Sequence, residues 1–286
     1  MAILLFGKTG QVAREIQALA RVMALGRDAA DLSVPGNCAA AIERYAPSAV
    51  INAAAYTAVD RAEEEEDLAS QINGSAAAEM ARACTVRQIP FVHLSTDYVF
   101  DGSGKAPWSP GDRAQPLSAY GRSKLTGETG ITEAGGCHVI LRTSWVFSEH
   151  GQNFVKTMLR LGQERSQLRV VSDQIGGPTS AVSIARACLT IADQLAKDPG
   201  KTGTYHFAGI PAVSWADFAR AIFAKAGLDC PVVDISSADY PQRARRPANS
   251  RLDCSATGAV FGIAMPDWQS DLVVVLGKLE QMTVGR

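Results

Sequence analysis

Residues 1–16 read MAILLFGKTGQVAREI, an apolar run followed by a glycine-rich turn and a helical pattern. The apolar run stops at Gly7 and helix periodicity begins within four residues, which predicts a buried strand, a tight turn and a helix. Gly7 allows a sharp turn, Gly10 allows the backbone to approach a pyrophosphate, and Ala13 allows close helix–strand packing. The spacing Gly-x-x-Gly-x-x-Ala matches neither Gly-x-Gly-x-x-Gly nor a P-loop. The stretch therefore indicates a phosphate site, with glycines that serve only the turn as the open alternative.

The composition is that of a globular protein without polyanion-binding or membrane-spanning segments. The chain has 286 residues, of which 47% are hydrophobic and 20% charged, and its net charge is −1. No basic excess, signal-peptide pattern or run of roughly twenty apolar residues is present. We therefore expect a cytoplasmic protein with no nucleic-acid and no membrane partner. The six cysteines are scattered without a Cys-x-x-Cys pair, so neither zinc nor a disulfide framework is expected.

Strand and helix patterns alternate through the first half of the chain. Strands are predicted at the N-terminal apolar run, at 22–25, at 49–55 and from residue 90 to about 95, with helices at 39–45 and about 68–87 between them. This alternation predicts an α/β fold with a doubly wound parallel sheet of the Rossmann type.

Beyond residue 147 the order of elements is less regular, which predicts a smaller C-terminal substrate-binding α/β domain. We place the dinucleotide-binding domain at 1–147 and the mainly substrate-binding domain at 148–286. Parts of about 165–205 and 240–260 are expected to return to the first domain.

The carboxyl ends of the predicted strands carry the residues expected to bind a dinucleotide. At the end of the second strand, an acidic residue favours NAD and an arginine favours NADP. Gly26 and Arg27 come first here and Asp28 follows, so the signal is mixed and leans to NADP. Arg27 as a solvated loop cation stays an open alternative. Small residues end the third strand and leave room for a ligand. The predicted cofactor-binding residues are Gly7, Thr9, Gly10, Gln11, Val12, Arg27, Asp31, Leu32, Ala53, Ala54, Ala55, Tyr56 and Thr57, joined by Tyr120 and Lys124.

Tyr120 and Lys124 lie four residues apart on a predicted helix that starts at residue 118. Side chains at this spacing share one helix face, so both can reach one ligand. Thr96 and Asp97 follow the fourth strand and should lie beside the same cofactor. His93, in the middle of that strand among apolar neighbours, is interpreted as a core histidine.

The order of these motifs resembles the extended branch of the short-chain dehydrogenase/reductase superfamily. Within it, five blocks resemble the dTDP-4-dehydrorhamnose reductase family: FGKTGQV at 6–12, NAAAYTAVD at 52–60, STDYVF at 95–100, RTSWVF at 142–147 and RRPANS at 245–250. The resemblance covers essentially the whole chain. The Tyr-Lys pair is shared by the entire superfamily, whereas the first and last blocks are much narrower.

The resemblance implies reduction of the C4 ketone of a dTDP-sugar, dTDP-4-dehydro-L-rhamnose, with NADPH as cofactor and NADH as an open alternative. Tyr120 would be the proton donor, Lys124 would lower its pKa and hold the nicotinamide ribose, and Thr96 would orient the carbonyl. Arg245 and Arg246 could bind phosphate, because a guanidinium group binds phosphate in a bidentate manner, and a solvated loop stays the open alternative. The expected substrate-binding residues are Thr96, Asp97, Trp145, Asn153, Arg246 and Asn249.

Two other chemistries of the superfamily, dehydration and epimerisation, need residues that this sequence does not have at the corresponding positions. Tyr98 stands where related dehydratases carry a glutamate, and Ser-Thr-Asp replaces the serine-rich run of epimerases, so both chemistries are disfavoured. Another nucleotide-sugar epimerase or reductase, or a noncatalytic dinucleotide-binding regulatory subunit, stays an open alternative.

Some family members form a magnesium-dependent dimer through glutamates. Glu15 matches one of these positions, but residues 181–186 lack the expected acid. A magnesium-bridged dimer is therefore doubtful and no metal ligand is predicted, with the protein expected as a monomer or homodimer.

Overall fold

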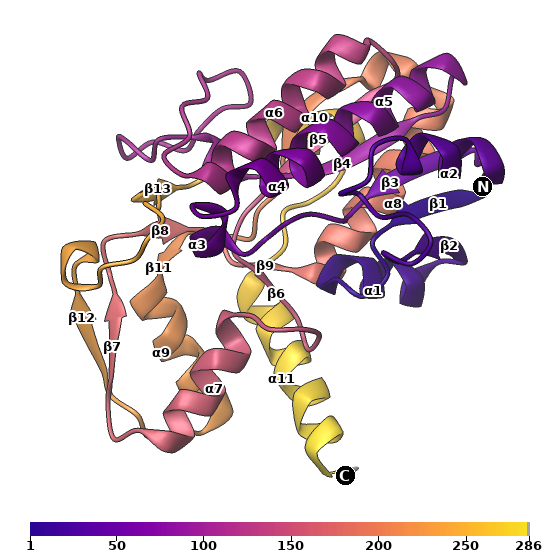
Figure 1. Ribbon diagram of the computed structural model, residues 1–286. Coiled ribbons are helices and arrows are strands. Elements are labelled where there is room, and N and C mark those ends of the chain that lie inside the picture. The colour runs from indigo at the N-terminus through magenta and orange to yellow at the C-terminus, as the bar shows by residue number, and fades with distance from the viewer. Residues whose placement is uncertain (285–286) are drawn as a thin grey trace.

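The computed structural model describes residues 1–284, and a six-stranded parallel sheet forms its centre (Figure 1). In spatial order the strands are β10 (Gly203–His206), β5 (His138–Thr143), β4 (Phe91–Thr96), β3 (Ala49–Asn52), β1 (Ile3–Phe6) and β2 (Val22–Leu25). From β1 the chain goes first to β2 on one side and then to β3 on the other. The carboxyl ends of β1 and β3 therefore border the crevice in which ligands bind in sheets of this kind.

Helices cover both faces of this sheet, as the alternating pattern predicts. Helices α1 (Gln11–Leu19), α8 (Ala181–Lys197) and α10 (Ser255–Phe261) pack on one face, and α2 (Asn37–Tyr45), α5 (Ala76–Val86) and α6 (Ala119–Ala134) pack on the other. Helix α1 buries Val12, Ala13 and Ile16 against the sheet, the stripe expected from its 3.6-residue period. The prediction of a doubly wound parallel sheet is confirmed.

Two predicted elements differ from the observed ones. The strand expected at 49–55 ends at Asn52, and the helix expected at 68–87 is divided into α4 (Glu66–Ser70), a π-helical turn at Gln71–Ser75, and α5. The π turn places Asn73 so that its amide donates to Ser123 Oγ of α6 at 2.9 Å and accepts from the Tyr56 backbone N–H at 2.8 Å. Helix periodicity alone does not reveal this turn, because its cause is the contact with α6.

The chain after residue 147 forms a second packed region and also contributes β10, α8 and α10 to the layers of the sheet. The second region contains α7 (Phe154–Glu164), α9 (Trp215–Ala226) and α11 (Trp268–Val284). Its strand pairings are β7 (Leu168–Val171) with β12 (Val232–Ile235), β6 (Val146–Phe147) with β9 (Thr179–Ser180), and β8 (Ile175–Gly176) with β11 (Val213–Ser214) and β13 (Asn249–Ser250). The predicted division into two domains stays a prediction.

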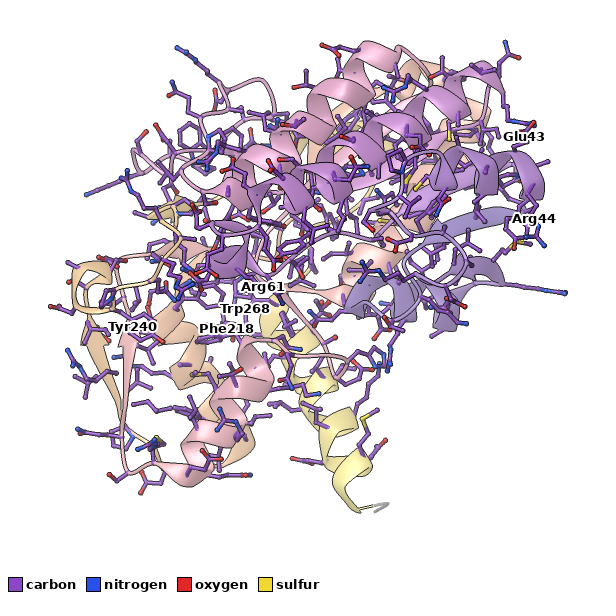
Figure 2. The ribbon with its side chains drawn as sticks, viewed as in Figure 1. Glu43, Arg44, Arg61, Phe218, Tyr240 and Trp268 are labelled. Atoms are coloured by element: carbon purple, nitrogen blue, oxygen red, sulfur yellow. The ribbon has the colours of Figure 1, made fainter. Side chains whose placement is uncertain are left out.

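Aromatic side chains fill the core of this second region. Phe218 of α9 packs edge-on against Trp268 of α11, with ring centroids 5.2 Å apart, and also contacts Phe147 (Figure 2). The remaining short elements are α3 (Val59–Ala62) and the 3-10 turns Asp97–Val99, Pro199–Lys201 and Ser237–Asp239. Within residues 1–284, no helix has the length and apolarity needed to cross a bilayer.

Helix α6 is fixed to the sheet by a buried ion pair. The Arg142 guanidinium of β5 donates to both carboxylate oxygens of Glu128, with the shortest contact at 2.6 Å, and Ser95 Oγ of β4 donates to Glu128 at 2.5 Å. The β4–β5 register sets Ser95 beside Arg142. Both charged side chains are at most 7% exposed, so water cannot solvate them. The arginine and the glutamate therefore depend on each other for neutralisation of their charges.

We predict that Arg142→Met destabilises the protein by about 3–5 kcal/mol, because it leaves the Glu128 carboxylate buried without its partner. The measurement is urea unfolding followed by far-UV circular dichroism. The matched control is Arg160→Met, which breaks the exposed Arg160–Glu164 pair of α7 and should change stability by no more than about 0.5 kcal/mol. Equal effects of the two substitutions would contradict the role given to the buried pair.

Candidate active site

A cleft of about 850 Å³ lies over the carboxyl ends of the central strands. Every residue predicted to bind the cofactor lines it: Gly7, Thr9, Gly10, Gln11, Val12, Arg27, Asp31, Leu32, Ala53, Ala54, Ala55, Tyr56, Thr57, Tyr120 and Lys124. Thr96, Asp97 and Trp145 line the same cleft. Residues from six separate stretches of the chain therefore meet along one surface.

The glycine turn has the conformation that close approach to a ligand requires. Gly7 has a φ of +100°, and a Cβ there would lie 3.1 Å from the backbone nitrogen of Ala54, so this position excludes a side chain. Gly10 is the N-cap of α1 and supplies no side-chain cap, which leaves the first N–H groups of the helix available. An uncapped N-terminus in a cleft fits the pyrophosphate of a dinucleotide.

Tyr120 and Thr96 lie close together in the cleft, with Thr96 at the end of β4. The Thr96 side chain lowers the pKa of the Tyr120 phenol, and the Tyr98 ring packs edge-on against Tyr120 with centroids 5.7 Å apart. Burial raises the pKa of Tyr120 to about 12 despite this effect. Tyr120 therefore carries its proton at neutral pH.

Lys124 is buried and bound away from the phenol. Its Nζ donates to the Leu94 carbonyl oxygen at 2.6 Å and lies 3.0 Å from His93 Nε2. Burial lowers the pKa of Lys124 to about 8, opposed by the charge of Glu128. The lysine contacts strand β4 in this structure, and the expectation that Lys124 lowers the pKa of Tyr120 stays a prediction.

Asp97 is a buried carboxyl at the same strand end. Its Oδ1 accepts from Thr96 Oγ1 at 3.1 Å, whereas Oδ2 has no hydrogen-bond partner among the described residues. Burial raises the pKa of Asp97 to about 7, although hydrogen bonds from Ser250 and Thr96 lower it. An unpaired buried oxygen in a cleft is available to a polar group of a bound molecule.

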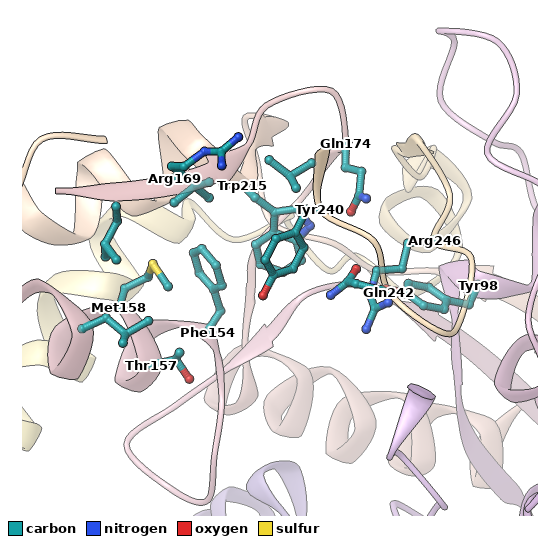
Figure 3. Close-up of a pocket in the computed structure, with 14 residues that line it drawn as sticks. Tyr98, Phe154, Thr157, Met158, Arg169, Gln174, Trp215, Tyr240, Gln242 and Arg246 are labelled. Carbon is teal, nitrogen blue, oxygen red and sulfur yellow. The ribbon is translucent and has the colours of Figure 1, made fainter. Parts of the chain in front are cut away.

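A second cavity of about 290 Å³ continues from the first, since Tyr98 and Trp215 line both. Figure 3 shows Phe154 toward one end of it and Arg246 and Tyr98 toward the other. The Arg246 guanidinium is held by Asp60, with Nη2 2.7 Å from Oδ2. At the junction the Trp145 ring stacks on Trp215 with centroids 3.5 Å apart. Aromatic side chains thus line this cavity along its length, with Arg169 on the Phe154 side and Arg246 on the Tyr98 side.

Two residues expected to bind substrate lie outside both cavity linings. Asn249 is buried, and its amide donates to the carbonyl oxygens of Ser103 and Ala106, so it anchors the loop that follows β4. Asn153 caps α7 by accepting from the Lys156 N–H, and its amide donates to Gln11 Oε1 at 2.9 Å. The structure therefore gives both asparagines structural partners and does not bring them together with Thr96 and Arg246.

Sequence reasoning missed several residues at the site. Lys8 lines the cleft beside Gly7, and Phe154, Trp215 and Tyr240 line the second cavity. His93 was assigned to the core, and it is 1% exposed, but its partner there is the active-site Lys124. Nothing in the local pattern distinguishes these aromatic residues from core residues, because their placement depends on how α7, α9 and β12 pack.

Glu15 lies in a cluster with Glu149 and His150, whose ligand-type atoms are all within 4.8 Å of one another. The Lys278 ammonium of α11 binds Glu149 Oε1 at 2.5 Å and lies 3.9 Å from Glu15 Oε1. An internal cation therefore already faces these carboxylates. The expectation of no metal ligand stays a prediction.

A doubly wound parallel sheet, a glycine turn below the cleft, and the pair Tyr120 and Lys124 beside Thr96 define a dinucleotide-dependent oxidoreductase of the short-chain dehydrogenase/reductase class. The chain belongs to the RmlD substrate binding domain family, whose sequence model matches residues 1–281. The resemblance drawn from the sequence motifs is thereby confirmed.

Individual relatives agree with this placement. The dTDP-4-dehydrorhamnose reductase of Sinorhizobium fredii is 44% identical over 279 residues, and the match covers 94% of each chain. The crystal structure of a dTDP-4-dehydrorhamnose reductase from Clostridium acetobutylicum superposes with a TM-score of 0.92 at 36% identity, covering 98% of this chain and 100% of that one. The Bacillus anthracis enzyme, solved in complex with NADP, gives a TM-score of 0.90 at 31% identity, covering 97% and 100%.

We predict that Asp97 makes folding stability fall as the pH rises from about 4 to about 7. Its pKa is about 7 in the folded protein and near 3.9 in an unfolded chain, so between these values the folded state binds a proton that the unfolded state has lost. Asp97→Asn removes this contribution. Relative to wild type, the variant should gain about 2–4 kcal/mol between pH 4 and pH 8, measured by urea unfolding. A stability difference that is the same at both pH values would refute this prediction.

Proposed function

We propose that this protein reduces the C4 ketone of dTDP-4-dehydro-L-rhamnose to give dTDP-L-rhamnose, with NADPH as the reductant. The observation that carries the proposal is the placement of Thr96, Tyr120 and Lys124 together in the cleft that begins at the glycine turn. A phenol that keeps its proton beside a hydroxyl that can orient a carbonyl is the donor set that ketone reduction needs. The matching relatives named dTDP-4-dehydrorhamnose reductase support the choice of substrate.

Each residue of the site has a separate role in the proposed ketone reduction. NADPH, when bound, supplies the hydride to the ketone carbon. Thr96 Oγ donates to the carbonyl oxygen and Tyr120 transfers its phenolic proton to the alkoxide as it forms. Lys124, whose Nζ donates to the Leu94 carbonyl oxygen in this structure, contacts the nicotinamide ribose in the proposed complex. Asp97 Oδ2 is available to a hydroxyl of the sugar.

The second cavity suits the nucleotide half of the substrate. The rings of Phe154, Trp215 and Tyr240 offer flat apolar surfaces to a pyrimidine base, and Arg246 can bind the diphosphate in a bidentate manner. The sugar would then lie between the cavities, near Tyr98 and the stacked pair of Trp145 and Trp215.

The adenosine end of the cleft carries two cations and two acids. Lys8 and Arg27 line it together with Asp31, which pairs with Arg27 Nε at 3.1 Å, and the Asp28 carboxylate lies beside Gly26. An arginine at this position can pair with a 2′-phosphate, and the Bacillus anthracis relative was solved with NADP. We therefore propose NADPH as the preferred cofactor. The cytoplasmic location and the monomeric or homodimeric state predicted from the sequence stay predictions.

We predict that Tyr120→Phe abolishes turnover while NADPH still binds, because the substitution removes only the transferable proton. Lys124→Met should lower turnover and also weaken NADPH binding. The measurements are loss of NADPH absorbance with dTDP-4-dehydro-L-rhamnose and calorimetric titration of NADPH. Near wild-type activity in either variant contradicts the assigned roles, and an inactive wild-type protein that binds NADPH would indicate a regulatory binding protein.

We further predict that Arg246→Gln raises KM for the dTDP-sugar about tenfold or more, since one charge-assisted interaction with phosphate is lost, and leaves KM for NADPH unchanged. Arg245→Gln is the matched control, because Arg245 is exposed and lies outside both cavity linings. The measurement is steady-state kinetics in which the dTDP-sugar and NADPH are varied in turn. If both substitutions raise KM for the dTDP-sugar equally, the assignment of Arg246 to phosphate is rejected.

A further inference from the structure

The side chain of Gln11 is held by two residues from a distant part of the chain. Gln11 is the first residue of α1 after the glycine turn, and it lines the cleft. Its Oε1 accepts from Ser148 Oγ at 2.8 Å and from Asn153 Nδ2 at 2.9 Å, which lie 137 and 142 positions away in the sequence. Two donors at the start of the second packed region therefore meet one oxygen at the phosphate-binding turn.

The backbone of α7 fixes the orientation of the Asn153 amide. The backbone N–H of Lys156 donates to Asn153 Oδ1 at 3.1 Å, and an N–H group can only donate. The NH₂ group of Asn153 must then face the other way, where it also meets the carbonyl oxygens of Ser148 at 2.7 Å and His150 at 3.3 Å. A reversed amide would place an oxygen against both carbonyl groups. Asn153 is therefore a donor toward Gln11.

A donor at Asn153 fixes the Gln11 amide in turn. The group of Gln11 that faces Asn153 must be the oxygen, because an NH₂ group cannot accept from another NH₂ group. The NH₂ group of Gln11 lies on the opposite side of the amide, and within residues 1–284 it has no acceptor. Gly151 packs against the stem of this side chain, since a Cβ there would lie 3.6 Å from Gln11 Cγ. Gln11 thus keeps a free pair of donors in the cleft that it lines.

We propose that Asn153 and Ser148 are positioning residues that hold Gln11 with its NH₂ group available to the pyrophosphate of the bound dinucleotide. The pyrophosphate is the expected partner because Gln11 lies at the uncapped N-terminus of α1, which attracts anions. Asn153 and Ser148 act through Gln11, and neither lines the cleft. The inference rests on the NADPH site of the proposed function and not on the identity of the sugar.

A side chain that is fixed before the cofactor arrives binds it more tightly. A free glutamine loses rotamer freedom when it contacts a ligand, whereas Gln11 is already held at its oxygen by two hydrogen bonds. An amide N–H that donates to a phosphate oxygen also forms a charge-assisted hydrogen bond. Asn153 further begins α7, whose next residue, Phe154, lines the second cavity. One asparagine therefore positions residues of both cavities.

Asn153→Asp tests the orientation and keeps the helix cap, because aspartate caps helices about as well as asparagine. The carboxylate still accepts from the Lys156 N–H, but it presents an oxygen where the NH₂ group was. Gln11 must then reverse its amide and turn its oxygen toward the cleft. We expect the Kd for NADPH, measured by calorimetric titration, to rise about tenfold or more. An unchanged Kd in the folded variant overturns the proposal.

A double-mutant cycle with Gln11→Ala separates positioning from a general effect of the new charge. Gln11→Ala alone should also weaken NADPH binding, because it removes the donor. The rise in Kd caused by Asn153→Asp should be at least about threefold smaller in the Gln11→Ala background, since Asn153 acts through Gln11. A smaller difference overturns the proposal, because it assigns the weakening to the charge or to local disruption.

Ser148→Ala tests the second donor without touching the cap of α7, so the proposal can be refuted even if Asn153→Asp does not fold. The Kd for NADPH should rise about threefold, because Gln11 keeps one of its two partners. Ser172→Ala is the matched control, since the Ser172 hydroxyl also donates to a backbone carbonyl but lies outside both cavity linings. Equal values of Kd in the two serine variants overturn the proposal.

Fragments of the cofactor identify the group that Gln11 binds. Adenosine 2′-phosphate has no pyrophosphate, so its Kd should be the same in wild type and Asn153→Asp. The Kd of 2′-phospho-ADP-ribose, which has the pyrophosphate but no nicotinamide, should rise as it does for NADPH. A loss confined to NADPH, or an equal loss for adenosine 2′-phosphate, overturns the proposal. None of these titrations needs turnover, so a wild-type protein that binds NADPH without reducing the dTDP-sugar refutes the proposed function and not this inference.

Discussion

The site depends on the Glu128 carboxylate of α6, which binds two neighbouring strands. Its hydrogen bonds to Ser95 and Arg142 hold that helix against β4 and β5. Tyr120 and Lys124 lie two turns and one turn earlier on the same helix, so the pair that fixes the helix also sets where the phenol and the amine lie. A buried charge pair of this kind tolerates little sliding, because any displacement leaves a charge without a partner.

Strand ends supply the other half of the site. The crossover from β2 to β3 opens a crevice above β1, and the glycine turn, the alanine-rich loop after β3 and Thr96 after β4 all face it. The second packed region adds the aromatic cavity, which meets the cleft at Tyr98 and Trp215. A dinucleotide and a sugar nucleotide can therefore meet end to end, with the reacting carbon near the junction of the two cavities.

Much of this arrangement could be predicted from local patterns. Periodicity located the strands and helices of the sheet, and every residue expected to contact the cofactor lines the cleft. Errors arose where long-range contacts override periodicity: the π turn at Asn73 exists because α6 requires its amide, and Asn249 serves a loop more than 140 residues away in sequence. The pKa of Tyr120 could not be predicted either, since it depends on burial and on where the Lys124 side chain is bound.

The sequence by itself determined the α/β layering, the glycine turn and the shared helix face of Tyr120 and Lys124, because each depends on spacing within a short segment. Only the tertiary structure decided which groups carry protons and what faces them. His93 and Asn52 are 41 positions apart and become neighbours through strand register, and Lys124 reaches them from a third element. Protonation in a buried site follows from the complete set of partners, and that set is assembled only when the layers pack.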